Sequence, residues 1–142
     1  MHERRVAREC VVKSLYAQKM TEERLETVVL DLMEREEVPG DVQEFCKTLA
    51  LKTHVRSDEL DEMIKGKSEH WDFDRIALLD KIILRMAICE LLYFDDVPPK
   101  VSISEAIEIA KDYSTENSGN FVNGILDSIL NDLQKEGRIF IE

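Results

Sequence analysis

The chain has 142 residues, a formal net charge of -11, 44% hydrophobic residues and 35% charged residues. This length suits one domain with a buried core, and the presence of only five glycines and three prolines favours long helices over strands and turns. Because the sequence holds neither an apolar leader nor a run of about 18 apolar residues, we expect a soluble, cytoplasmic, all-α domain spanning residues 1–142.

Residues 3–20 are predicted to form a helix with two different sides. At about 100° per residue, one side gathers Val6, Ala7, Cys10, Val11, Ser14 and Ala17, and the other gathers Arg4, Arg5, Arg8, Lys19 and Tyr16. We expect the first side to pack and the second to form an exposed basic stripe. Residues 1–19 carry a net charge of +3, which leaves -14 for the rest of the chain.

Two further helices are predicted before residue 66. Thr21 is the expected N-cap of a helix whose apolar stripe runs over residues 25–33 and which ends at Pro39-Gly40. Asp41 is the expected cap of a long third helix that reaches Gly66, with a break near residues 56–58.

The second half of the chain begins with its most apolar segment. Residues 75–94 are hydrophobic nearly all the way round, which is typical of a helix at the centre of a bundle. After Pro98 and Pro99, Ser102 and Glu105 fit a capping box for the next helix. A polar loop at 114–120 then leads to a last helix from Phe121 to Leu133, and the pattern leaves the placement of a tail at 136–142 open.

Motifs for catalysis and metal binding are missing from the sequence. No GxxxxGK[ST], GxGxxG, HExxH or CxxC pattern occurs, and the histidines lack the spacing of metal ligands. The three cysteines, Cys10, Cys46 and Cys89, are odd in number and lie in apolar helical patterns, so we expect buried, reduced thiols. We therefore expect no enzymatic activity, cofactor or metal.

The basic stripe is the better candidate for function. Arginine can bind a phosphate with its planar fork and stack on a base, and these arginines cluster where the rest of the chain is acidic. An ordinary solvated helix face would give the same pattern, so the stripe alone leaves both interpretations open.

Four segments together resemble the NusB family of bacterial transcription antitermination factors. They are "RRVAREC" with Leu15-Tyr16, "ILRMAICELLYFDDVP" at 83–98, "SEAIEIAK" at 104–111 and "FVNGILD" at 121–127. The resemblance implies a compact helical bundle of six to seven helices in two packed subdomains, without catalysis. It also implies that the protein binds boxA of nascent ribosomal RNA leader transcripts together with NusE, a small ribosomal subunit protein, and joins the RNA polymerase elongation complex.

The resemblance assigns RNA binding to seven residues and suggests where a partner binds. The family's RNA-binding positions fall on Arg4, Arg5, Arg8, Tyr16, Tyr113, Asn117 and Phe121. Phe121 has a second interpretation, because its spacing with Ile125 suits simple packing. For NusE we predict contacts at Asp80 and Glu90, the charges that interrupt the apolar helix, although solvent-facing positions of a core helix would explain them equally well.

Two departures from the family pattern bear on RNA binding. Val6 interrupts a run of arginines that is often longer, which predicts lower affinity, and Asn117 replaces a common acidic residue, which removes a negative charge near the RNA. The alternative function is an acidic helical adaptor that binds proteins but not RNA. Family members occur as monomers and dimers, so a homodimer stays open.

Overall fold

The computed structural model describes residues 2–67, 72–115 and 117–139. Over these ranges the chain forms seven α-helices and one short 3₁₀ helix, without a strand, which confirms the predicted fold class. The chain divides into unit 1, Met1–Val55, and unit 2, Arg56–Glu142. No helix in the described part of the chain is long and apolar enough to cross a membrane.

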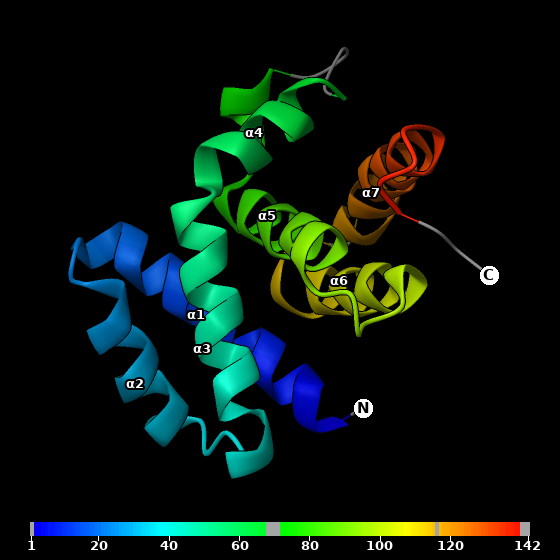
Figure 1. Ribbon diagram of the computed structural model, residues 1–142. Helices are drawn as coiled ribbons and strands as arrows, with labels where there is room; N and C mark the ends of the chain where they lie inside the picture. Colours follow the sequence, from blue (N-terminus) through cyan, green and yellow to red (C-terminus); the bar gives the residue numbers. More distant parts are fainter. Residues whose placement is uncertain (1, 68–71, 116, 140–142) are drawn as a thin grey trace. The chain divides into compact units, whose positions relative to one another are not determined.

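Unit 1 consists of three helices that all contact one another. They are α1 (His2–Thr21), α2 (Leu25–Arg35) and α3 (Gly40–Val55), at the blue to cyan-green end of the chain in Figure 1. The predicted apolar side of α1 is confirmed at Ala7, Cys10, Val11 and Ser14, which are buried, whereas Val6 and Ala17 of the same side are half-buried. The Cys46 thiol of α3 donates to the Ala7 carbonyl of α1 at 3.6 Å, so the two helices lie in close contact there.

The predicted helix caps in unit 1 are wrong in detail. Thr21 ends α1 instead of starting α2: its hydroxyl donates to the Ala17 carbonyl at 2.9 Å, and Glu22 then turns the chain with a φ of 60°. Asp41 lies inside the first turn of α3, because that helix begins at Gly40. A side chain that can cap the next helix closes the previous one here, and sequence pattern alone does not distinguish the two.

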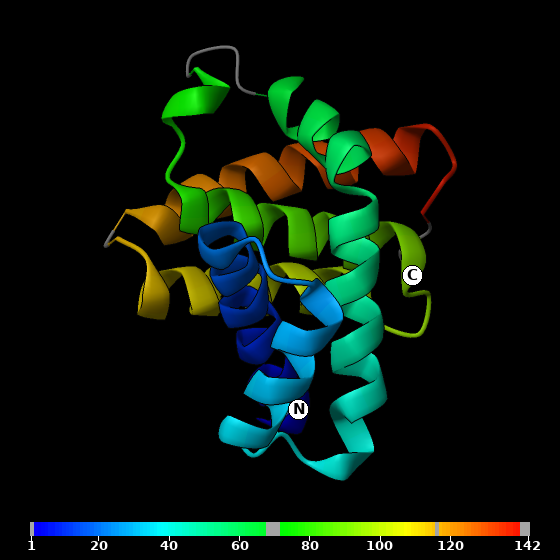
Figure 2. The ribbon, with the colours of Figure 1, turned by 90° about the vertical axis from the view of Figure 1, so that its left-hand side faces the viewer.

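Unit 2 is built around α5. The elements are α4 (Ser57–Lys65), η1 (Phe73–Arg75), α5 (Leu78–Tyr93), α6 (Pro99–Tyr113) and α7 (Ser118–Lys135). Helix α5 contacts α4, α6 and α7, and α6 lies beside α7 (Figures 1 and 2). Residues 82–84 and 86–91 of α5 are all buried, with only Arg85 between them half-buried, which confirms the prediction of a central helix. The predicted break near 56–58 is also confirmed, at Arg56.

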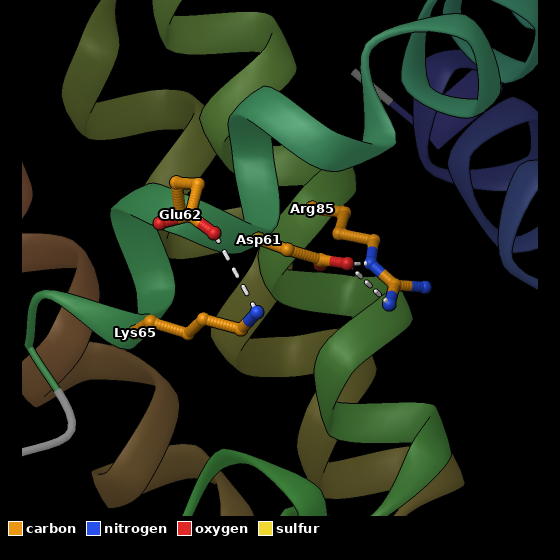
Figure 3. Close-up of polar contacts among 4 residues, drawn as sticks. All are labelled: Asp61, Glu62, Lys65 and Arg85. Carbon is orange, nitrogen blue, oxygen red and sulfur yellow. Dashed lines mark hydrogen bonds and ion pairs between the residues drawn. The ribbon is translucent and has the colours of Figure 1, made fainter.

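Polar contacts join α4 to α5 at the edge of this core (Figure 3). The Arg85 guanidinium donates to both oxygens of Asp61, at 2.5 and 3.1 Å. The Tyr93 hydroxyl donates to Glu59 at 2.6 Å, and this hydrogen bond raises the pKa of Tyr93 because the neutral phenol is the donor. A two-pronged guanidinium–carboxylate pair fixes orientation as well as distance, so α4 is held in one direction against α5.

The predicted capping box at Ser102 and Glu105 is wrong. Helix α6 begins at Pro99, one turn earlier, because proline at the first helical position loses no hydrogen bond. Ser102 is buried inside the helix, and its hydroxyl donates to Glu90 of α5 at 2.9 Å. A residue expected at a helix end thus links two core helices.

The structure places the start of the C-terminal tail. Gly137, with a φ of 74°, follows α7, and the Arg138 N–H donates to the Leu133 carbonyl at 2.9 Å. The Gly137 N–H donates to Gln134, so the helix ends in a Schellman motif. Ile139 is 9% exposed, so the tail folds back as far as this residue; 140–142 lie outside the described residues.

Gly124 gives a stability prediction. It lies inside α7, is exposed, and a Cβ built there meets nothing within 4 Å. Glycine in a helix interior costs about 0.5–1 kcal/mol relative to alanine. Gly124→Ala is therefore expected to raise the free energy of unfolding by about that amount in urea titrations, and a lower free energy would contradict the open space seen at this position.

Candidate functional site

Unit 2 contains a cavity of about 340 Å³ at one end of its helices. It lies where η1, the start of α5, the loop before α7 and the first turn of α7 meet. Its lining consists of Asp72, Arg75, Ile76, Ala77, Asp80, Thr115, Asn117, Ser118 and Phe121. The volume is near the lower end of the range of about 300–1,000 Å³ for small-ligand sites, so the cavity suits one flat group rather than a large ligand.

Ser118 fixes the geometry of this cavity. It is 2% exposed and stands at the first position of α7. Its hydroxyl donates to Asp80 Oδ2 of α5 at 3.1 Å and accepts the N–H of Thr115 at 3.2 Å. These hydrogen bonds hold the loop and the start of α7 against α5. They thereby fix the places of Asn117 and Phe121, which lie on either side of Ser118 in the sequence.

Asp80, which lines the cavity, carries one carboxylate oxygen without a hydrogen-bond partner among the described residues. The residue is 7% exposed, and one oxygen accepts from Ser118. The other oxygen, Oδ1, is buried and has no hydrogen-bond partner among the described residues. Because an ionised carboxylate only accepts hydrogen bonds and a buried acceptor is costly to leave unpaired, this oxygen is an unsatisfied acceptor in a residue of the cavity wall.

The predicted site residues of unit 2 are only partly brought together. Asn117 and Phe121 both line the cavity, with Asn117 exposed and Phe121 half-buried. Tyr113 ends α6, is 36% exposed and is not among the lining residues. Phe121 is thus the aromatic residue that lines the cavity, and the exposed ring of Tyr113 lies outside the lining.

The predicted site residues of unit 1 do not form a uniformly exposed stripe. Tyr16 is 40% exposed, Arg4 and Arg5 are half-buried, and Arg8 is only 2% exposed. The guanidinium carbons of Arg4 and Arg8 lie 4.4 and 5.3 Å from the ring centre of Phe45 on α3. The expectation of an exposed Arg8 is wrong, because this ring and the helix packing around it cover a guanidinium group that periodicity places on the polar side.

The exposure expected of Asp80 and Glu90 is also wrong. Glu90 is 1% exposed and accepts from Ser102, and Asp80 accepts from Ser118. Both carboxylates connect α5 to neighbouring helices, as buried polar groups with partners do. As the structure stands, neither side chain is presented on the surface for a partner.

All three cysteines are buried and reduced, as predicted. The neighbouring Cys46 thiol lowers the pKa of Cys10, and the neighbouring Cys10 thiol together with burial raises the pKa of Cys46. Each of these thiols also has a neighbour in unit 1, at Ser14 for Cys10 and at the Ala7 carbonyl for Cys46. The pair occupies the contact between α1 and α3, away from any described cavity.

Comparison with known proteins assigns the family. The model of the NusB family matches residues 5–131. The chain belongs to the NusB family. It is 46% identical over 143 residues to the transcription antitermination protein NusB of Salinibacter ruber, a match that covers 98% of this chain and 88% of that protein. The predicted family resemblance is thus confirmed.

Solved NusB structures share the fold. One is NusB of T. maritima, 37% identical, with a TM-score of 0.83 and coverage of 90% of each chain. Another is a structure of the antitermination factors NusB and NusE in complex with double-stranded RNA, 25% identical, with a TM-score of 0.83 over 93% of this chain and 98% of that one.

Several residues of this NusB-family cavity were not predicted as site residues. Arg75, Asp72 and Thr115 line it, and Ser118 organises it. The polar composition of 114–120 was a signal for Thr115 and Ser118. Arg75 precedes an apolar helix, and nothing in the neighbouring sequence indicates that the fold places it in the same cavity as Phe121.

Proposed function

We propose that this chain is an RNA-binding transcription antitermination factor that, with NusE, binds boxA of nascent ribosomal RNA leader transcripts and joins the RNA polymerase elongation complex. It acts in the cytoplasm without catalysis. The observation that carries the proposal is the cavity of unit 2, which combines the Phe121 ring, the Asn117 amide and the unpaired Asp80 Oδ1 in a chain of the NusB family.

The cavity has the groups needed to recognise one unstacked base. Proteins read single-stranded RNA by stacking bases on aromatic rings and by hydrogen bonds to the base edges. Phe121 supplies the ring, Asn117 both donates and accepts, and Asp80 accepts an N–H of the base. Buried acceptors discriminate strongly against ligands that lack the matching donor, so this arrangement favours particular bases over others.

Helix α1 supplies phosphate contacts in this proposal. Arg4 and Arg5 are half-buried, so their positions are restricted while part of each side chain stays accessible. Tyr16 adds an exposed ring and Tyr113 a second one on unit 2. Arg8 contributes indirectly, because its burial beside Phe45 makes it part of the support of α1.

A basic partner follows from the charge of the chain. The chain outside its first 19 residues carries -14, which repels a polyanion and attracts a basic protein. A NusB relative has been solved with NusE and RNA, which supports NusE as this partner. Since Asp80 and Glu90 are buried, we place the partner contact on exposed carboxylates instead. A homodimer stays an alternative assembly.

The test is cooperative binding measured in both directions. Saturating NusE is expected to tighten binding of boxA-like RNA, and the RNA is expected to tighten NusE binding by the same factor, because coupling free energies are reciprocal. Fluorescence anisotropy with labelled RNA and then with labelled NusE measures both factors, with scrambled RNA as the control.

The adaptor function predicts a different result. An acidic adaptor without RNA binding would bind NusE equally well with or without RNA and would not distinguish boxA-like from scrambled RNA. That pair of results would replace the proposed function by the adaptor.

A further inference from the structure

The Phe45 ring of α3 contacts two arginines of α1. The guanidinium carbon of Arg4 lies 4.4 Å from the ring centre, and that of Arg8 lies 5.3 Å from it. Arg4 and Arg8 are four residues apart, so they are neighbours on the same face of the helix. Both distances are within the range of about 6 Å at which a ring attracts a cation. A single side chain of α3 thus engages this face of α1.

A close helix contact sets the ring beside these arginines. Ala7, which lies between Arg4 and Arg8 in the sequence, is fully buried, and its carbonyl accepts from the Cys46 thiol at 3.6 Å. Cys46 follows Phe45 in α3 and is also fully buried. Because close-packed cores leave little room for rearrangement, the core of unit 1 fixes the position of the ring before any RNA binds.

Of the two arginines, Arg4 is the one that RNA can reach. Arg8 is 2% exposed, whereas Arg4 and Phe45 are half-buried. A ring attracts the charge and the flat face of a guanidinium, whereas a phosphate binds the N–H groups at its edge. Arg4 can therefore keep its contact with the ring while it binds a phosphate. Ordering a flexible side chain at an interface reduces affinity, and the ring removes part of that loss.

We propose that Phe45 is a positioning residue for RNA binding: its ring holds the Arg4 guanidinium in the place from which Arg4 binds a phosphate of the RNA. The inference rests on the proposed function and adds to it a residue that acts without touching the RNA. Arg8 supports the same arrangement from inside unit 1, because it is covered and contacts the same ring.

The test compares variants that remove or keep the ring. Phe45→Leu keeps an apolar side chain without a ring, so RNA is expected to bind about two- to twelvefold more weakly, because Arg4 then has to be ordered on binding. The slope of log K against log salt is expected to stay at the wild-type value, since no phosphate contact is removed. Phe45→Tyr keeps the ring and is expected to bind RNA as the wild type does. Arg4→Gln removes a contact and is expected to flatten the slope by about 0.7 for single-stranded RNA.

A double variant separates positioning from packing and from direct contact. In the Arg4→Gln background, Phe45→Leu is expected to cause no further loss of affinity, because residues that act through one another are not additive. An equal loss in both backgrounds would overturn the inference, since damage to the fold or stacking of Phe45 on a base would act without Arg4.

NMR of the wild-type chain tests the geometry without any variant. An aromatic ring shields protons above its face, so the Arg4 Nε–H proton is expected upfield of that of Arg24, whose side chain is 80% exposed. Equal chemical shifts of the two protons would overturn the inference. Wild-type RNA affinity in Phe45→Leu would also overturn it and would leave the proposed function in place. Absence of RNA binding by the wild type would overturn the proposed function and this inference with it.

Discussion

Asp80→Lys is expected to lower the free energy of unfolding by about 3–5 kcal/mol, the cost of an uncompensated charge in a protein interior. Asp80 is 7% exposed and holds the Ser118 hydroxyl at 3.1 Å. The substitution removes that acceptor and buries an ammonium next to Lys81. Urea unfolding followed by circular dichroism measures the change.

Asp127→Lys is the matched control for this effect. Asp127 is exposed on α7, so the same charge change there is expected to alter the free energy of unfolding by no more than about 0.5 kcal/mol. Equal stability of the two variants would show that Asp80 is not the buried connection seen here. Because Asp80→Lys is expected to damage the fold, a loss of NusE binding in this variant would not identify Asp80 as a partner contact.

Phe121→Ala is expected to weaken binding of boxA-like RNA by about 1–3 kcal/mol, or roughly 5- to 150-fold, because stacking of one base on an aromatic side chain contributes that much. The ring lines the cavity beside Asn117 and is half-buried. Filter binding at fixed salt measures the loss.

A conservative variant distinguishes stacking from packing at Phe121. Phe121→Leu keeps an apolar side chain but has no ring, so it is expected to keep most of the stability and to lose RNA affinity as Phe121→Ala does. Phe121→Tyr keeps the ring and is expected to bind RNA nearly as the wild type does. If Phe121→Leu bound RNA with full affinity, the residue would serve packing alone, the second interpretation that its spacing with Ile125 allows.

Helix positions were largely predictable because hydrophobic periodicity is a local signal. The central position of 75–94 and the break at Arg56 both followed from it. Helix starts were less predictable, because Thr21 and Ser102 use their hydroxyls for contacts that compete with capping. Burial of Arg8, Asp80 and Glu90 was not predictable from periodicity at all, since their partners Phe45, Ser118 and Ser102 come from other helices.

The residues of the candidate site were likewise only partly predictable from the sequence. Asn117 and Phe121 were identified by resemblance to the family, and the structure places both at one cavity. Arg75 was not identified, because only the fold brings η1 next to the first turn of α7. Whether the seven predicted RNA-binding residues bind RNA stays a prediction.

Cross-linking shows directly which part of the chain contacts the RNA. BoxA-like RNA that carries 4-thiouridine at each position in turn is bound to the full chain with NusE, irradiated, and the attached peptides are identified by mass spectrometry. We expect cross-links to the peptide that contains Asn117 and Phe121 and to the first turns of α1. We also expect competition by unlabelled boxA-like RNA but not by scrambled RNA. Cross-links confined to α2 or to the exposed middle of α6, with neither of the predicted peptides attached, would contradict it.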